Sequence, residues 1–378
     1  MNLASFMLVI FTKFTFESNF IDALEVGEPY PFSCVFSFKN STWEKPKMLN
    51  SPTGEISFLN KGIAIANSIV DSFRWFVGYD GEVRIFRPDF KLDRLNYGSQ
   101  KMNLEEIPKS YFYRCLNLFV EEARNRNMLP DPLKNQSIYT FSIYAASRAS
   151  NFVEQASETI FRLTGQMSNK LFHWKHATLK ARIEPDNFKN IGSFLAQYKA
   201  TSNYGISYVA DAIAKKSNYT TTLFLYPKTK RRKCLADLSN ANLFIVFRNK
   251  KGHTLVTLHD DHTLYAGSYR NSVITISQMI QNLRFKKRCV DVEMLQALVN
   301  SGQIVEMFSS GNSAQITPIT EISYKGEIIK IPTVQQSNPV YLQINNILYD
   351  IFYGLTKNAL FHEWMFCITA NGNDLQKC

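Results

Sequence analysis

The sequence predicts a mixed α/β (α+β) fold divided into two domains, and three observations support this prediction. The chain has 378 residues, enough for two or three domains of ordinary size. Apolar residues make up 45% and charged residues 20%, which excludes collagen-like, coiled-coil and disordered chains. Segments with helical spacing of apolar residues also alternate with short runs rich in β-branched and aromatic residues.

Hydrophobic spacing places these elements along the chain. The apolar segment 1–11 is interrupted by Thr12 and Lys13 and is too short to span a bilayer, so it is interpreted as a strand. No later run is long enough for a membrane helix, so no membrane partner is expected. We expect helices at 108–127, 206–213 and 340–351, strands at 83–86, 137–145 and 220–226, and hairpins pairing 242–248 with 253–258 and 316–324 with 327–331. Gly354 is expected to end the last helix in a left-handed conformation.

A lapse in the pattern predicts the domain boundary. Small and polar residues fill 164–169, as is usual where domains connect. We therefore expect a first domain over 1–163, a linker over 164–173 and a second domain over 174–378.

The charge balance favours anionic partners without identifying them. Lys plus Arg is 43 and Asp plus Glu is 32, a net charge of +11. The basic run 228–233 could bind nucleic acid, but no aromatic RNA-binding signature accompanies it. It is therefore interpreted as a solvated loop between two strands, and nucleic acid is not expected as a partner.

Cysteine spacing and the common short motifs give mainly exclusions. The six cysteines follow no short repeat, which argues against a disulfide framework and a zinc ribbon and favours a reducing compartment, with the cytoplasm as the default. The run 259–262, His-Asp-Asp-His, contains metal-ligand residue types, but four adjacent residues rarely converge on one ion. It is interpreted as a solvated loop, and no metal is expected. Phosphate-loop, dinucleotide and metalloprotease motifs are absent.

Four longer phrases carry more information. They are Gly-Glu-Val-Arg-Ile-Phe-Arg-Pro at 81–88 running into Leu-Asp-Arg-Leu at 92–95, Tyr-Lys-Ala-Thr-Ser-Asn-Tyr-Gly at 198–205, Leu-Ala-Asp-Leu-Ser-Asn-Ala-Asn-Leu-Phe at 235–244, and the stretch from 305 to 366. Together they resemble the branched-chain amino-acid aminotransferases of the animal type. That family consists of pyridoxal-phosphate enzymes with the two-domain D-amino-acid-aminotransferase-like fold (fold type IV), and the resemblance covers nearly the whole chain.

The resemblance implies roles for individual residues. Lys199 is expected to form the Schiff base, which requires a neutral amine and hence a depressed pKa. Arg94 is expected to bind the cofactor phosphate, for which a permanently charged fork of donors is suited. Tyr204 would hydrogen-bond the phenolic oxygen of the cofactor. Asp237 stands where the family has Glu and would keep the pyridine nitrogen protonated, although it is one methylene shorter.

Two turns complete the expected site. The amides of Ser268 and Tyr269 would meet the phosphate. Asn312 and Ser313 replace the family's Thr-Ala pair, so Asn312 would bind phosphate and Ser313 the substrate α-carboxylate. Tyr139 is expected to contact the substrate.

The substrate pocket departs from the family pattern. Ile65 falls where a pocket tyrosine is expected, and Val70 begins a phrase that replaces Phe-Glu-Gly-Met-Lys. Phe141 stands in place of the arginine that handles the side-chain carboxylate of glutamate or 2-oxoglutarate. Ala314 and Thr317 replace the redox cysteine pair, so no thiol switch is expected there.

These observations favour transamination of leucine, isoleucine and valine with 2-oxoglutarate, in a homodimer whose partner subunit completes the pocket. Two other hypotheses stay open. One is a non-catalytic or altered-substrate relative that keeps the fold, with or without the cofactor, and the other is a basic protein that binds nucleic acid through 228–233. The sequence does not choose between cytosol and mitochondrion.

Overall fold

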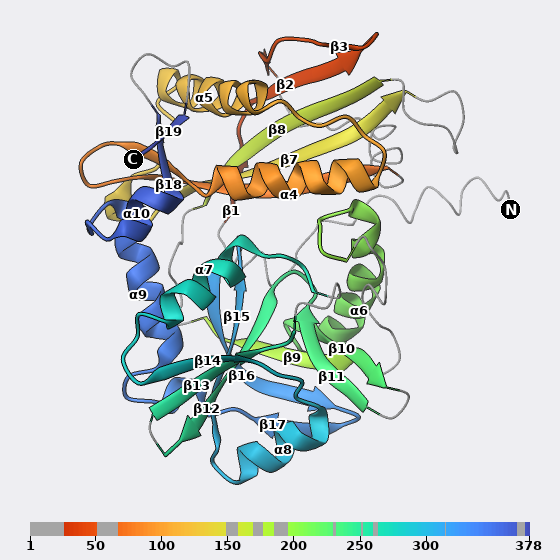
Figure 1. The fold of residues 1–378 in the computed structure, drawn as a ribbon, viewed down its shortest axis with the longest axis vertical. Helices are drawn as coiled ribbons and strands as arrows, with labels where there is room; N and C mark the ends of the chain where they lie inside the picture. The colour runs from red at the N-terminus through yellow and green to blue at the C-terminus, as the bar shows by residue number, and fades with distance from the viewer. Residues whose placement is uncertain are drawn as a thin grey trace, which may run out of the picture.

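Two lobes, each built on its own β-sheet, make up the protein in this computed structural model (Figure 1). The structure describes residues 26–50, 67–148, 158–168, 177–184, 196–229, 232–250, 252–259, 264–313, 315–368 and 375–378. The predicted mixed α/β fold with two domains is confirmed by this arrangement.

The first sheet is antiparallel throughout its described strands. Its order is β19 (Leu375–Lys377), β18 (Met365–Ile368), β6 (Val83–Phe86), β5 (Ser68–Val77), β7 (Ser137–Arg148), β8 (Glu158–Ser168), β2 (Phe32–Lys39) and β3 (Thr42–Trp43), with β1 (Val26–Pro29) beside β8 and β4 (Lys47–Asn50) beside β2. Helices α4 (Pro88–Lys101) and α5 (Lys109–Asn125) pack on it, and the short η1 (Pro132–Lys134) leads into β7.

The second sheet is mixed. Its order is β11 (Arg232–Leu238), β10 (Thr221–Thr229), β9 (Leu179–Glu184), β16 (Gln315–Tyr324), β15 (Ile304–Gly311), β12 (Asn242–Asn249), β13 (Gly252–Thr257) and β14 (Leu283–Lys287), with β17 (Glu327–Lys330) beside β16. The helices of this half are η3 (Thr201–Tyr204), α6 (Gly205–Lys216), α7 (Ser268–Ser277), α8 (Val292–Asn300), η4 (Thr333–Gln335), α9 (Val340–Tyr353) and α10 (Ala359–Trp364).

Strand β12 shows why this sheet is covered on both faces. Its sequence is an unbroken apolar run rather than an alternating one, as expected of a strand buried on both sides. Phe244 and Val246 pack with α7 and α9, whereas Leu243 and Ile245, which point the other way, pack with α8.

Several elements lie where the spacing predicts them. The helix expected over 108–127 is α5, which buries Phe112, Leu116 and Phe119 against the first sheet. The helix expected over 340–351 is α9, which ends at Gly354 with a φ of 70°. Helix α6, strands β6, β7 and β10, and the β12–β13 and β16–β17 hairpins are likewise confirmed.

The linker prediction is wrong in part. Thr164 to Ser168 are small and polar, yet they form the second half of β8 because they pair with residues 137–141 of β7. The C-terminal strands β18 and β19 also return to the first sheet, where β18 pairs with β6. Residues 169–173 and the strand predicted at 1–11 lie outside the described residues.

The cysteine interpretation is wrong. All six cysteines form disulfides, Cys34 with Cys115, Cys234 with Cys289 and Cys367 with Cys378. The Cα atoms of each pair lie 5.7, 5.2 and 5.1 Å apart, within the usual range. The pairs are separated by 81, 55 and 11 residues, so no short spacing reveals them.

Two further observations bear on the sequence predictions. In the basic run 228–233, Lys228 and Thr229 end β10 and Arg232 and Lys233 begin β11, while residues 230 and 231 lie outside the described residues. Arg232 donates from Nε to Asp291 Oδ2 at 2.9 Å. Within the described part of the chain, no helix is both long enough and apolar enough to cross a bilayer.

Candidate active site

Strand β5 brings the two lobes together at the candidate site. Arg74, near the end of β5, donates from Nε to the carbonyl oxygen of Asn312 at 2.7 Å and from Nη2 to the carbonyl oxygen of Ser313. Earlier in the strand, the amide of Val70 donates to the carbonyl oxygen of Lys199 at 2.9 Å. One strand of the first sheet therefore holds both the turn after β15 and the segment that carries Lys199.

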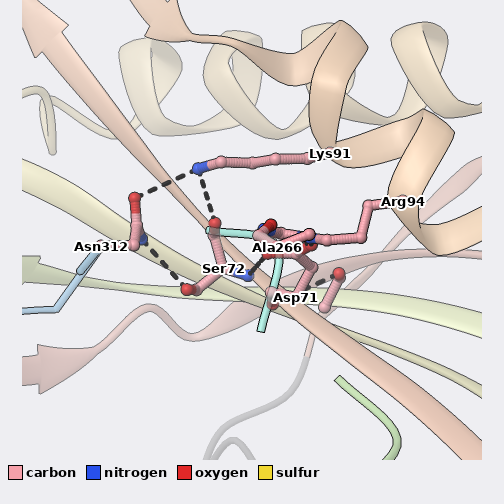
Figure 2. Close-up of polar contacts among 7 residues, drawn as sticks. Asp71, Ser72, Lys91, Arg94, Ala266 and Asn312 are labelled. Carbon is pink, nitrogen blue, oxygen red and sulfur yellow. Dashed lines mark hydrogen bonds and ion pairs between the residues drawn. The ribbon is translucent and has the colours of Figure 1, made fainter. Parts of the chain in front are cut away.

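Arg94 and Asp71 form a buried ion pair at the centre of the site (Figure 2). Arg94 Nε donates to Asp71 Oδ2 at 2.9 Å, and Nη2 donates to Oδ1 at 2.7 Å and to Oδ2 at 2.6 Å. Burial by itself lowers the pKa of the Arg94 guanidinium, but the adjacent Asp71 carboxylate outweighs burial and raises it above its usual value. The positive charge at this position is therefore fixed.

Tyr265 connects Arg94 to Lys199. Arg94 Nη1 donates to the carbonyl oxygen of Ala266 at 2.6 Å, and the guanidinium carbon lies 4.6 Å from the centre of the Tyr265 ring. Lys199 Nζ lies 5.5 Å from the same ring centre. The Tyr265 hydroxyl is buried and has no hydrogen-bond partner among the described residues, and burial raises its pKa well above the ordinary value. A buried polar atom of this kind calls for an explanation, and a polar ligand supplies one.

Lys199 and Tyr204 lie on one short segment beside β5. Lys199 ends a turn over 196–199, and the next residue, Ala200, forms a bridge with Ile69. Tyr204 ends η3 five residues on. Burial, with the Asp71 charge adding to it, raises the pKa of the Tyr204 hydroxyl, so the hydroxyl keeps its proton and can donate a hydrogen bond to an anionic oxygen.

Asp237 is held from the second sheet. It lies on β11 and is 7% exposed. The side-chain nitrogen of Asn242, Nδ2, donates to both carboxylate oxygens at 3.0 Å, and the backbone amide of Tyr265 donates to Oδ2 at 3.2 Å. The same Asn242 nitrogen donates to the carbonyl oxygen of Tyr265 at 2.9 Å, so the acid and the Tyr265 backbone are positioned together.

The start of α7 depends on a glycine. Gly267 precedes Ser268 and Tyr269, and a Cβ at Gly267 would collide with Asn242 Oδ1, the side chain that holds Asp237. The Tyr269 ring packs edge-on against Phe86 in the apolar core, with 5.1 Å between the ring centres. Because its side chain is held there, Tyr269 can offer only its backbone amide to a ligand at the start of α7.

The turn after β15 is built into a polar network (Figure 2). Asn312 Nδ2 donates to Ser72 Oγ at 3.0 Å, and Asn312 Oδ1 accepts from Lys91 Nζ at 3.1 Å. Lys91 Nζ also donates to the carbonyl oxygen of Ser72 at 2.7 Å. Tyr139 lies beside this network, with its ring centre 5.2 Å from the guanidinium carbon of Arg74.

The positions that depart from the family line the same strands. Val70 is buried on β5, and Phe141 on β7 pairs with Ser72 of β5. Thr317 lies on β16, 7% exposed. Ile65, Ala314 and the Asp-Asp-His part of 259–262 lie outside the described residues.

The structure groups most of the residues named from the sequence but adds five others. Lys199, Arg94 and Asp237 all contact Tyr265 or its backbone, and Asn312 and Ser313 meet β5 through Arg74. The sequence did not single out a role for the residues that hold them, Asp71, Arg74, Lys91, Asn242 and Tyr265. One signal for Lys91 was available, because a residue three positions before Arg94 lies on the same helical face.

Several solved structures with the same fold are branched-chain amino acid aminotransferases. The branched-chain amino acid aminotransferase of Thermobaculum terrenum in its PLP form superposes with a TM-score of 0.69 at 18% identity, over 89% of this chain and 98% of that one. The Thermoproteus uzoniensis enzyme gives a TM-score of 0.65 at 17% identity, over 89% and 99%. The fold is therefore that of these aminotransferases.

Sequence comparison defines the family. The class IV amino-transferase model matches residues 68–322, and the chain belongs to that family. The cytosolic branched-chain-amino-acid aminotransferase of Rattus norvegicus is 23% identical over 324 residues, 85% of this chain and 76% of the rat protein. The mitochondrial enzyme 1 of Arabidopsis thaliana is 27% identical over 270 residues, 71% of this chain and 66% of the plant protein.

The residues present fit pyridoxal phosphate, the cofactor of this class. The charged groups that act on Lys91 are three cations, Arg94, Lys199 and Arg74, and one carboxylate, Asp71. Because positive charge is in excess in a buried place, a phosphate would be favoured there. The acid Asp237 accepts a hydrogen bond from the backbone amide of Tyr265, and its carboxylate is the kind of group that can pair with a protonated ring nitrogen.

Proposed function

We propose that this protein is a pyridoxal-phosphate-dependent aminotransferase that acts on leucine, isoleucine and valine with 2-oxoglutarate as the amino acceptor. The observation that carries the proposal is the joint approach of Lys199 and Arg94 to one half-buried tyrosine ring, Tyr265, within the residues that match the family. The names of the relatives support the substrate class.

The proposed work is divided among the chain's own groups. The cofactor supplies an electron sink for the substrate α-carbon. Lys199 attaches the cofactor, and its amine then moves the proton that leaves the α-carbon. Arg94, the amides of Ser268 and Tyr269, and Asn312 hold the phosphate, while Tyr204 donates to the phenolic oxygen and Asp237 keeps the ring nitrogen protonated.

The substrate side of the proposal involves β7 and the turn after β15. Tyr139 and the Ser313 amide would receive the α-carboxylate of the substrate. Both residues contact Arg74. Phe141 gives this part of the pocket an apolar side chain, which suits branched aliphatic substrates but removes the cation expected for a dicarboxylate. Among acceptors, a monocarboxylic 2-oxo acid should therefore compete well with 2-oxoglutarate.

The proposed homodimer is supported by an exposed apolar face on α6. Ile206, Val209 and Ile213 follow helical spacing and are 43%, 62% and 41% exposed. A contiguous apolar face beside the site usually marks an interface. Val209→Glu should give a monomer in size-exclusion chromatography with light scattering, whereas Lys215→Glu, away from this face, should not. A dimer that survives Val209→Glu would contradict this interface.

The cytoplasm is proposed as the compartment of this protein. The cytosolic relatives support the cytoplasm. The three disulfides oppose it, because such bonds persist in oxidising compartments. Labelling thiols in intact cells separates the two, since cytosolic protein should react at its cysteines and protein from an oxidising compartment should not.

The function is tested by absorbance of the purified protein incubated with pyridoxal phosphate. Wild-type protein and Lys216→Ala, a control at the exposed end of α6, should show a bound-cofactor band that leucine, valine or isoleucine shifts. Lys199→Ala should lack this band. A band that no amino acid shifts would favour the non-catalytic relative, and no band in the wild-type protein would overturn the proposal.

A further inference from the structure

Lys91 is a buried lysine for which the proposed function has no role. It lies on α4 one turn before Arg94 and is 0% exposed. Its Nζ donates to the carbonyl oxygen of Ser72 at 2.7 Å and to Asn312 Oδ1 at 3.1 Å (Figure 2). The same nitrogen lies 5.0 Å from the centre of the Phe73 ring. Lysine is almost never fully buried unless it is paired.

The described surroundings provide no carboxylate reserved for this lysine. The charged groups acting on it are Asp71, Arg94, Lys199 and Arg74, and Asp71 is already bound by Arg94 through both oxygens. Burial first, and then the three cations, depress the pKa of the Lys91 amine well below its usual value. The two acceptors among the described residues account for two N–H groups of the amine, which leaves one position on Nζ for a further partner.

Asn312 connects Lys91 to the expected phosphate position. The family resemblance assigns phosphate contacts to Arg94 and to the residue at 312, and Lys91 donates to the Asn312 side chain. Lys91 and Arg94 also lie on the same face of α4 (Figure 2). A phosphate held by Arg94 and Asn312 would therefore lie close to the Lys91 amine.

We propose that Lys91 is a second cationic ligand of the cofactor phosphate, which takes up a proton from solvent as the phosphate binds and donates its third N–H to a phosphate oxygen. The proposal rests on the proposed function, because it concerns the same cofactor. A nearby dianion favours the charged form of the amine and so supplies the free energy for this protonation. No role in positioning the reacting carbon is implied.

The test compares two ligands that differ only in the phosphate. Apo protein is titrated with pyridoxal phosphate and with pyridoxal, for wild type, Lys91→Met and Lys101→Met, an exposed lysine at the end of α4. Lys91→Met should weaken pyridoxal phosphate binding by about tenfold or more, as expected for a charge-assisted hydrogen bond, and leave pyridoxal binding unchanged. Lys101→Met should change neither affinity.

Two further readouts exclude a merely structural role. Calorimetry in buffers of different ionisation enthalpy should show that wild type takes up about one more proton than Lys91→Met on binding pyridoxal phosphate. The apo form of Lys91→Met should unfold at the wild-type temperature or above, because methionine removes a buried amine. If that variant does not fold, Lys91→Gln, which keeps a donor to Asn312 but carries no charge, serves in its place.

The outcomes separate this proposal from the proposed function. Equal weakening of both ligands, or unchanged affinity for pyridoxal phosphate, would overturn the role of Lys91 while leaving the aminotransferase intact. If wild-type protein binds neither ligand, the proposed function fails, and the inference fails with it.

Discussion

The two halves of the candidate site hold their charges in opposite ways. On the first-lobe side, Arg94 and Asp71 form a bidentate pair and Lys91 adds a second basic group. On the second-lobe side, the acid Asp237 has an uncharged side-chain amide, Asn242, as its donor. The difference shows that the site is polarised, with its cations where a phosphate would lie and its acid where a ring nitrogen would lie.

The largest expected effect comes from breaking the charge pair of the first half. Asp71→Asn would leave the Arg94 guanidinium buried without its carboxylate, which should lower the free energy of unfolding by about 3–5 kcal/mol. Urea denaturation measures this value. Asp237→Asn changes a carboxylate whose donors described above, the side chain of Asn242 and the backbone amide of Tyr265, are neutral, and it should cost about 1 kcal/mol or less. Equal losses in the two variants would contradict the contrast between the halves.

The next effect concerns a buried acid of the second lobe. Glu306 on β15 is 1% exposed and accepts hydrogen bonds from the backbone amides of Val340 and Tyr341 at the start of α9. Burial raises the pKa of its carboxyl to about 7. Because its pKa is 4.5 when unfolded, its contribution to stability is complete below pH 4.5 and is lost as pH rises to about 7.

This loss amounts to about 3 kcal/mol across that window, and Glu306→Gln should abolish it. The measurement is the difference in unfolding free energy between wild type and variant at pH 4.5 and pH 7.5. A difference that does not change with pH would show that Glu306 ionises normally in the folded protein.

The acid of the second half should matter for rate more than for stability. Asp237→Asn cannot hold a proton on the ring nitrogen and should lower the transamination rate about 10²-fold. Asp237→Glu restores the length found in the family and should retain activity. Steady-state kinetics with leucine measures both, and a rate for Asp237→Asn within twofold of wild type would remove this residue from the proposed mechanism.

The last prediction sharpens the comparison within the first half. Arg74 is buried like Arg94, but its hydrogen bonds go to the carbonyl oxygens of Asn312 and Ser313 and to the Ser137 hydroxyl. Arg74→Met removes donors but leaves no buried carboxylate, so the loss should be about 1–2 kcal/mol. Thermal unfolding of Arg74→Met and Asp71→Asn, measured side by side, ranks the two losses of stability. A larger loss for Arg74→Met would contradict the expected ranking.

The sequence predicted the fold better than the site. Apolar spacing identifies α5 and α9 because each buries one face, and that spacing is local. Thr164 to Ser168 were misassigned because strand pairing with β7, which is not local, outweighs their composition. The disulfides join positions up to 81 residues apart and leave no local pattern.

The same distinction between local and non-local signals explains which residues of the site could be predicted. The resemblance supplied Lys199, Arg94 and Asp237, but not the residues that hold them. Asp71 lies 23 positions from Arg94, and Asn312 lies 221 positions from Lys91, so only the folded chain brings these partners together. For such pairs the sequence carries residue types but not distances.

The return of β18 to the first sheet constrains how the chain assembles during synthesis. Strand β6 follows β5 early in translation, yet its other neighbour, β18, leaves the ribosome only after the strands and helices of the second lobe. Until then the edge of the first sheet at β6 exposes unpaired backbone groups, which invite pairing between nascent chains. A message truncated before β18 would therefore yield a protein with an open sheet edge in its first lobe, although the missing residues follow the second lobe in the sequence.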